Sequence, residues 1–200
     1  MSTLFPPPIY RPDGTTIRRW TAEEYLRLAD LGFFINQRVE LIDGEIIQRS
    51  PIRNPHAAAV TRLTSLLSAK LSEDRYWVRV QATLALGDES YPEPDIAVVD
   101  GPVTSEGPIP SAALLVIEVS DSTLALDRGR KLSLYASANI AEYWVVNVVD
   151  REIEVHRSPV ADSASHFGHR YALTRVARPG DQISPLLDPS ITFGVSRVFA

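Results

Sequence analysis

The sequence predicts an α/β (α+β) protein in which a mixed β-sheet is flanked by helices. Its 200 residues are an ordinary length for one domain. Hydrophobic residues make up 44% and charged residues 22%, which is typical of a globular chain. Segments with helical spacing alternate with short β-branched runs. We expect residues 1–19, rich in Pro, Thr and Arg, to form an extended arm, and residues 20–200 to form a single domain.

Three helices are predicted from capping signals and apolar spacing. The segment Thr21–Glu24 is a capping box that begins the first helix. Asn54-Pro55 provides an N-cap and a first-turn proline for the second, whose apolar residues continue to about Ser72. The third is expected from about Leu124 to Ala138.

The predicted strands follow from turn residues and from the pattern of apolar side chains. Asp43-Gly44 between two apolar runs indicates a hairpin. Strict alternation from Val78 to Leu86 predicts a half-buried strand, and the apolar runs Asp95–Val99 and Ala112–Val119 are typical of central strands. The remaining expected strands are Tyr143–Val149 and Glu152–His156, joined at Asp150-Arg151, and a strand near Tyr171–Val176.

Composition excludes several classes of function. The chain has no cysteine, which excludes disulfide scaffolds, thiol nucleophiles and Cys-based metal sites. Its longest apolar run, Ala112 to Ile117, is far shorter than the roughly 20 residues that cross a bilayer. The first residues do not resemble a signal peptide, so a cytoplasmic location is the default expectation. The net charge of −5 argues against a purely electrostatic DNA-binding module, and less strongly against an enzyme that holds cations.

Two carboxylates stand at the ends of the predicted central strands. Asp95 opens one strand, where a simple turn residue is the alternative interpretation. Glu118 lies within LLVIEVS on the same predicted face as Val116, so its charge needs a cationic partner, either a structural salt bridge or a metal ion. If the two strands are neighbours, both carboxylates lie at one sheet end, an arrangement that suits Mg²⁺. Glu40 before the Asp43-Gly44 hairpin is a third candidate acid, with a solvent-facing strand position as the alternative.

The helix after Glu118 carries Asp127, Lys131 and Tyr135 at a spacing of four, which places them on one face. An i,i+4 salt bridge is the simpler explanation of the first two. However, Lys70 and Lys131 are the only lysines among 20 basic residues. A lysine, with its compact charge and adjustable pKa, can orient or deprotonate water as arginine cannot.

His56 lies in the first turn of the second predicted helix, where backbone N–H groups attract anions. A phosphate contact and a packed helix-terminal histidine are both open interpretations. The other histidines have no fixed metal-ligand spacing.

Together these features resemble the Uma-two family of restriction-endonuclease-like proteins, in the PD-(D/E)xK nuclease superfamily. The residues that carry the likeness are Glu40, Pro94-Asp95, Glu118-Val119-Ser120 and the helix with Asp127, Lys131 and Tyr135. The resemblance extends from WTAEEYL through RVELIDGEII, EPDIAVV, LLVIEVSDST, DRGRKLSLYA and AEYWVV to ISPLL.

The resemblance implies a restriction-endonuclease-like fold, hydrolysis of phosphodiester bonds in DNA, and a homodimer. It also implies Mg²⁺ as cofactor, with Mn²⁺ as the alternative. The superfamily pattern has a lysine two residues after the glutamate, where this chain has Ser120. Lys131 matches the position of a lysine that has migrated to the next helix.

The functional hypothesis gives each residue a role. Asp95 and Glu118 bind the metal, Glu40 contributes through a water or a second ion, and Lys131 positions and activates the attacking water. The supporting residues are Asp127, Tyr135 and His56. The expected phosphate contacts are Arg128 and Arg130 and, in the arm, Arg18 and Arg19. The rival hypothesis is an inactive nuclease-fold module that binds nucleic acid or a protein, and a third is a structural domain whose carboxylates form only salt bridges.

Overall fold

The computed structural model describes residues 9, 10, 14 and 16–200, which form two compact units. The larger unit consists of residues 52–82, 94–108 and 112–200. The smaller unit consists of the described residues up to 51 together with 83–93 and 109–111. Within the predicted arm, residues 1–8, 11–13 and 15 lie outside the described part of the chain. The single domain expected over residues 20–200 stays a prediction.

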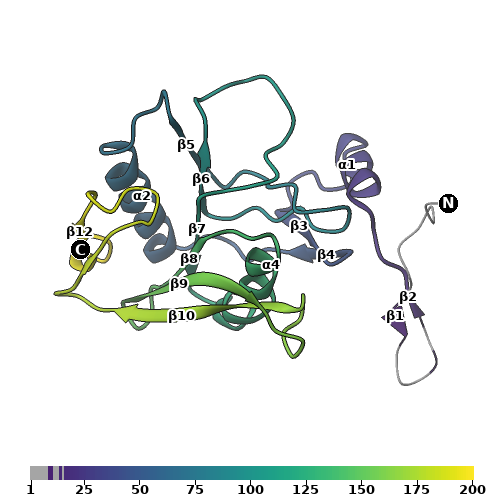
Figure 1. Ribbon diagram of the computed structural model, residues 1–200. Helices are drawn as coiled ribbons and strands as arrows, with labels where there is room; N and C mark the ends of the chain where they lie inside the picture. The colour runs from purple at the N-terminus through teal and green to yellow at the C-terminus, as the bar shows by residue number, and fades with distance from the viewer. Residues whose placement is uncertain (1–8, 11–13, 15) are drawn as a thin grey trace. The chain divides into compact units, whose positions relative to one another are not determined.

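The larger unit is built on a six-stranded sheet in the order β10-β9-β8-β7-β6-β5 (Figure 1). Strands β7 and β8 run parallel, and the other neighbouring strands run antiparallel. This confirms the predicted mixed sheet. The strands are β5 (Tyr76–Val80), β6 (Ile96–Asp100), β7 (Leu115–Ser120), β8 (Glu142–Asn147), β9 (Glu152–Ala161) and β10 (His169–Ala177).

Strand β7 lies in the middle of this sheet and all six of its residues are buried. Its side chains point alternately to the two faces. Ile117 and Val119 pack in the same apolar cluster as Leu63 of helix α2 (Asn54–Ser68). Glu118 and Ser120 point to the other face, where they contact the helical segment that follows. Helices therefore cover both faces of the sheet, as predicted.

The helical segment after β7 is not one continuous α-helix. It consists of α3 (Leu124–Leu126), a π-helical stretch η1 (Asp127–Lys131) and α4 (Leu132–Ser137). Gly129, a weak helix former, lies in the middle of the π-helical stretch. Single π-helical turns inside α-helices are frequent at functional sites. The predicted helix over 124–138 is thus correct in extent but not in its internal hydrogen bonding.

Several boundaries differ from prediction, and strand β9, for example, continues to Ala161 where an end at His156 was expected. Strand β5 ends at Val80 because Gln81 has a φ of 47°, which a strand cannot continue, so the predicted strand from 78 to 86 was wrong beyond that point. Helix α2 has Arg53, not Asn54, as its N-cap, and it ends at Ser68. The sequence showed the right pattern of apolar residues but not the backbone turn at Gln81.

The C-terminal quarter of the chain completes the core of the larger unit. The β8–β9 hairpin turns at Asp150-Arg151, as predicted. After β10, short strands β11 (Gln182–Ile183) and β12 (Phe193–Gly194) pair with each other, and a 3-10 turn η2 (Val195–Arg197) follows. Ile183, Phe193 and Val195 are buried in the same cluster as the apolar face of α2.

The smaller unit contains one helix and two hairpins. Helix α1 (Ala22–Asp30) begins with the predicted capping box, in which Thr21 and Glu24 bond reciprocally. Strands β3 (Val39–Ile42) and β4 (Glu45–Gln48) form the predicted hairpin, with positive φ at Asp43 and Gly44. Short strands β1 (Ile9–Tyr10) and β2 (Thr16–Ile17) form a second hairpin where only an extended arm was expected.

The β3–β4 turn yields a test of this local structure. Gly44 has a φ of 71°, and a Cβ at this position would clash with the side chain of Arg19, which pairs with Asp43. Gly44→Ala should lower the free energy of unfolding by about 2 kcal/mol or more, from backbone strain and overpacking together. Gly87→Ala is the matched control, because Gly87 also has positive φ but open space around it. Equal urea midpoints for the two variants would contradict the predicted clash.

Candidate active site

Asp95 and Glu118 lie opposite each other at one end of the β6–β7 pair. The antiparallel register pairs Ile96 with Ile117, and one further step along it brings Asp95 opposite Glu118. Side chains of directly opposed residues are on the same face, with Cβ atoms about 4.5–5.5 Å apart. The Asp95 carboxylate also accepts a hydrogen bond of 2.9 Å from the Val119 amide. The prediction that neighbouring strands bring these two acids to one sheet end is confirmed.

Glu118 is only 2% exposed and its carboxylate is paired with a buried lysine. Lys131 Nζ donates to Glu118 Oε1 at 2.9 Å, and Tyr135 Oη donates to the same oxygen at 2.7 Å. The ammonium and the phenol come from one helical face, four residues apart. The expectation of a cationic partner for Glu118 is therefore confirmed, and that partner is Lys131.

Asp127 is held by the strand end rather than by solvent. Ser120 Oγ donates to Asp127 Oδ2 at 2.7 Å, and Thr123 Oγ1 donates to the same oxygen at 2.6 Å. Burial raises the pKa of the Asp127 carboxyl above its ordinary value, and the charge of Lys131 and the two hydroxyl bonds oppose that rise. Ser120 occupies the position of the motif lysine, and here it fastens the helix that supplies Lys131.

The Asp95 carboxylate has two further partners in the larger unit. His56 Nε2 lies 3.0 Å from Asp95 Oδ2, and Gln81 Nε2 donates to Asp95 Oδ1 at 3.3 Å. His56 was expected to contact a phosphate or to pack at the helix end, and the structure places it on a carboxylate. Gln81 was not among the predicted residues. The sequence does not reveal this contact, because the alternation of apolar residues gives no sign of the positive φ that turns Gln81 toward Asp95.

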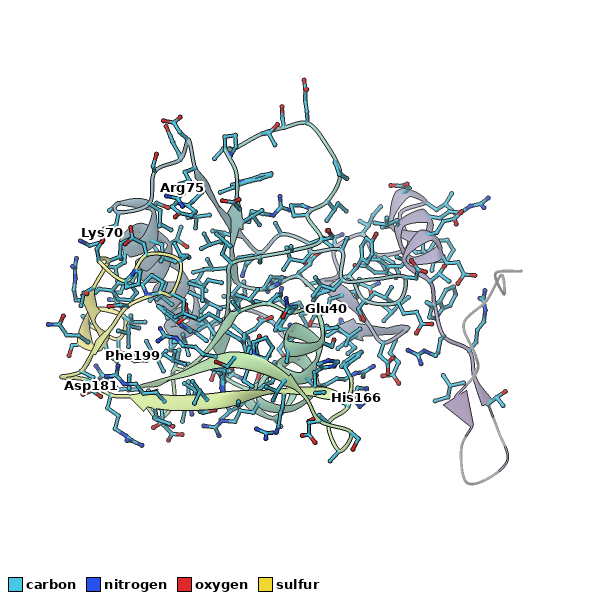
Figure 2. All side chains as sticks on the ribbon, in the orientation of Figure 1. Glu40, Lys70, Arg75, His166, Asp181 and Phe199 are labelled. Carbon is cyan, nitrogen blue, oxygen red and sulfur yellow. The ribbon has the colours of Figure 1, made fainter. Side chains whose placement is uncertain are left out.

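Glu40 belongs to the smaller unit and is 1% exposed. Its carboxylate accepts a hydrogen bond of 3.1 Å from the Glu93 amide, so the solvent-facing alternative is wrong. Figure 2 labels its position on β3. The predicted part of Glu40 in metal binding stays a prediction.

The arginines expected at phosphates have partners within the protein. Arg128 Nε donates to Glu154 Oε1 at 2.6 Å, and its guanidinium also lies 3.5 Å from Glu152. The hydrogen bond to Glu154 raises the pKa of Arg128. Arg130 lies in the same π-helical stretch. In the arm, Arg18 pairs with Glu24, and Arg19 pairs with Asp43 and Glu89.

The donor chemistry at the β6–β7 end suits a hard divalent cation. Asp95 and Glu118 provide two carboxylates, and Mg²⁺ typically takes one or two carboxylates and completes its octahedron with water and phosphate. Among the residues that the structure describes, no three His, Cys, Asp or Glu side chains are grouped as ligands of one ion. The two carboxylates are donors of the kind that Mg²⁺ or Mn²⁺ takes, but Asp95 is 1% and Glu118 2% exposed, so water reaches an ion there only if the site opens.

Comparison with models of known protein families identifies the family of this chain. The model of the Uma2 family, described as "Putative restriction endonuclease", matches residues 22–195. The chain belongs to the Uma2 family. Among solved structures it is similar to "a putative nuclease belonging to DUF820" from Anabaena variabilis, at 18% identity and a TM-score of 0.68. That match covers 90% of this chain and 97% of the other, and it confirms the expected fold. No curated protein matches significantly.

Membership of the Uma2 family supports a nuclease function in general terms. The resemblance seen in the sequence is thereby confirmed over most of the chain. In the described part of the protein, no helix is long and apolar enough to span a bilayer.

The buried ion pair yields a stability test. Lys131→Met leaves the Glu118 charge buried without its ammonium, which should cost about 3–5 kcal/mol of unfolding free energy. Glu118→Gln combined with Lys131→Met should cost clearly less than the sum of the two single changes, because no charge is then left unpaired. Urea unfolding followed by circular dichroism measures both. Lys70→Met at the exposed end of α2 is the control and should change stability little.

Proposed function

We propose that this protein is a Mg²⁺-dependent endodeoxyribonuclease that hydrolyses phosphodiester bonds in DNA, with Mn²⁺ as an alternative ion. The observation that carries the proposal is the 2.9 Å contact of Lys131 Nζ with Glu118 Oε1, at the strand end where Asp95 lies opposite Glu118. Two acids and an amine from distant parts of the chain thus meet at one point. Family membership supports the reaction class.

The proposed metal ligands are the carboxylates of Asp95 and Glu118, with Glu40 contributing through water or a second ion. A bound divalent ion supplies Lewis-acid stabilisation of charge on phosphate oxygens and lowers the pKa of coordinated water. His56 and Gln81 support this proposal because their bonds to Asp95 fix the orientation of its carboxylate. An oriented ligand reduces the reorganisation that binding requires.

Lys131 is proposed to position the attacking water and to stabilise negative charge near the phosphate. Its ammonium is compact, and burial gives it a low-dielectric setting in which its charge acts strongly. Tyr135 shares its acceptor, Glu118 Oε1, and so limits the positions that the carboxylate can take. Asp127 is proposed as a positioning residue, because its bonds to Ser120 and Thr123 fix the helix that carries Lys131.

The site residues are buried, so this mechanism requires the chain around them to open. Asp95, Glu118 and Lys131 are between 1% and 2% exposed. A phosphate reaches such groups only when the chain around them opens, so the proposal includes a local opening on DNA or metal binding. Arg128 and Arg130 are proposed phosphate contacts in the opened state, in which Arg128 exchanges its partners Glu152 and Glu154 for the substrate.

The same burial favours a second candidate function, a nuclease-fold module that binds nucleic acid or a protein without chemistry. In that case the Glu118–Lys131 pair is a structural salt bridge. Ser120 in place of the superfamily lysine also favours this candidate, whereas the bond of Lys131 to Glu118 favours the nuclease. The two candidates differ in metal binding and in cleavage.

The nuclease proposal predicts cleavage of plasmid DNA with Mg²⁺ or Mn²⁺. Asp95→Asn should reduce the rate by about 10²–10⁴-fold, a range seen when a group that stabilises transition-state charge is removed. Asp100→Asn at the other, exposed end of β6 is the matched control and should cleave like the wild type. A folded wild-type protein that leaves DNA intact with both ions contradicts the proposal.

Calorimetry separates the enzyme from the binding module. The enzyme should bind Mn²⁺ with heat that disappears in Asp95→Asn and persists in Asp100→Asn. A module without chemistry has no need of that ion, so absence of Asp95-dependent binding favours the second candidate.

We also propose a homodimer, because cleavage of both strands of a duplex is commonly achieved by pairing two sites. Sedimentation should then report twice the 22.1 kDa chain mass. A species of single-chain mass at micromolar concentration contradicts this part of the proposal.

A further inference from the structure

The exposed side of helix α2 borders two hollows that share one arginine. One hollow, of about 270 Å³, is lined by Arg62, Lys70 and Arg197 among others. The other, of about 410 Å³, is lined by Arg62 and Arg151 together with the end of the chain near Phe199. Figure 2 labels Lys70 and Phe199 beside α2 and the C-terminal segment. We call this surface, defined by Arg62, Lys70, Arg151 and Arg197, the α2 groove.

Three of the four cations of the α2 groove have no partner among the described residues, and the fourth, Arg151, donates to the Phe199 carbonyl. The side chains of Arg62, Lys70 and Arg197 form no hydrogen bond or ion pair with any described residue. No aspartate or glutamate of the described chain lines either hollow. Elsewhere the protein pairs its arginines closely, as with Arg128 and Glu154 or Arg157 and Glu142.

The groove runs along one side of helix α2. Asn54, Ala58, Thr61, Ser65 and Ala69 line it at steps of three or four residues, which is one side of a helix. This side is opposite the apolar face that packs on the sheet. From residue 54 to residue 70 the rise of about 1.5 Å per residue gives a track of about 24 Å.

One end of the groove, at Asn54, lies in the first turn of α2, on the side of the helix opposite His56, which is 3.0 Å from the Asp95 carboxylate. Of the groove cations only Arg62 lies on α2 itself. Lys70 lies just beyond its C-terminal end, and Arg151 and Arg197 belong to the C-terminal part of the chain. A polyanion that lies along the outer side of α2 would contact these cations.

We propose that the α2 groove binds the sugar–phosphate backbone of duplex DNA that extends beyond the scissile phosphate. The proposal rests on the nuclease function above and adds to it a binding surface outside the site. Arginine presents planar N–H donors that match phosphate oxygens, and lysine adds a point charge. A track of about 24 Å corresponds to roughly seven base pairs at about 3.4 Å each.

Duplex DNA fits this groove better than a protein or an apolar ligand. Its phosphates are evenly spaced anions, and the groove offers Arg62, Lys70 and Arg197 without partners among the described residues and no Asp or Glu side chain in its described lining. The net charge of −5 means that general attraction is weak, so affinity depends on local positive charge of this kind. Because the contacts are to phosphates, binding here is independent of base sequence.

The test is salt-dependent binding of a labelled duplex of about 20 base pairs, measured by fluorescence anisotropy in EDTA so that no cleavage occurs. The groove variant is Lys70→Ala/Arg197→Ala, because both side chains are exposed and neither has a hydrogen bond or ion pair with a described residue. The control, Arg27→Ala/Arg175→Ala, removes two exposed charges elsewhere. Circular dichroism and urea unfolding confirm that both variants are folded.

Each lost phosphate contact lowers the slope of log K against log salt by about 0.9. The groove variant should therefore lose about 1.8 from the slope, equally for unrelated sequences. Between about 0.05 and 0.2 M salt, the affinity of the wild type for the duplex should then fall by a factor about twelve times larger than the factor for the groove variant. The control should keep the wild-type slope.

Equal slopes for the groove variant and the control overturn the proposal, as does a wild-type protein that binds no duplex. A loss seen with duplex RNA but not with duplex DNA overturns the choice of ligand. Cleavage of plasmid with Mg²⁺ is measured separately on the same samples. A wild type that binds DNA through the groove but never cleaves it refutes the nuclease function, while the groove proposal stands. A wild type that cleaves, together with a groove variant that binds DNA as the wild type does, refutes the groove proposal alone.

Discussion

A carboxylate inside a sheet must be compensated, and the ion pair of Glu118 with Lys131 is the interaction on which the site depends. Glu118 stands in a strand whose residues are all buried, where an unpaired charge would cost several kcal/mol. The ammonium at 2.9 Å and the Tyr135 hydroxyl at 2.7 Å satisfy that requirement. Because the pair is buried, the helix that carries Lys131 cannot turn or slide without exposing or unpairing one of the charges.

The surrounding elements follow from this constraint. The antiparallel register of β6 and β7 places Asp95 beside Glu118, and the Val119 amide holds the Asp95 carboxylate in that position. The hydroxyl of Ser120 donates to the Asp127 carboxylate and so ties the end of β7 to the helical segment that carries Lys131. The π-helical stretch from Asp127 to Lys131 brings both side chains to the buried side. Helix α2 joins the arrangement through His56, and its outer side borders a separate group of cations to which it contributes Arg62.

Much of this could be predicted from the chain because it depends on local signals. The carboxylate within LLVIEVS indicated the need for a counter-charge of unspecified identity, and the resemblance to the Uma-two family placed Lys131 at the site. The positions that were missed depend on backbone turns without a distinctive sequence. Gln81 reaches Asp95 because its φ is 47°, and the π-helical stretch depends on tertiary bonds that the pattern of residues does not encode. The buried environment of Glu40 likewise depends on the distant Glu93 amide.

The proposed link between the buried Glu118–Lys131 pair and hydrolysis of a phosphodiester is a divalent ion bound by Asp95 and Glu118. The most direct measurement is anomalous X-ray scattering from crystals of the protein grown with Mn²⁺ and a short duplex. The account predicts a peak within about 2.2 Å of oxygen atoms of both Asp95 and Glu118. A peak elsewhere, or none at these two carboxylates at saturating Mn²⁺, would contradict it.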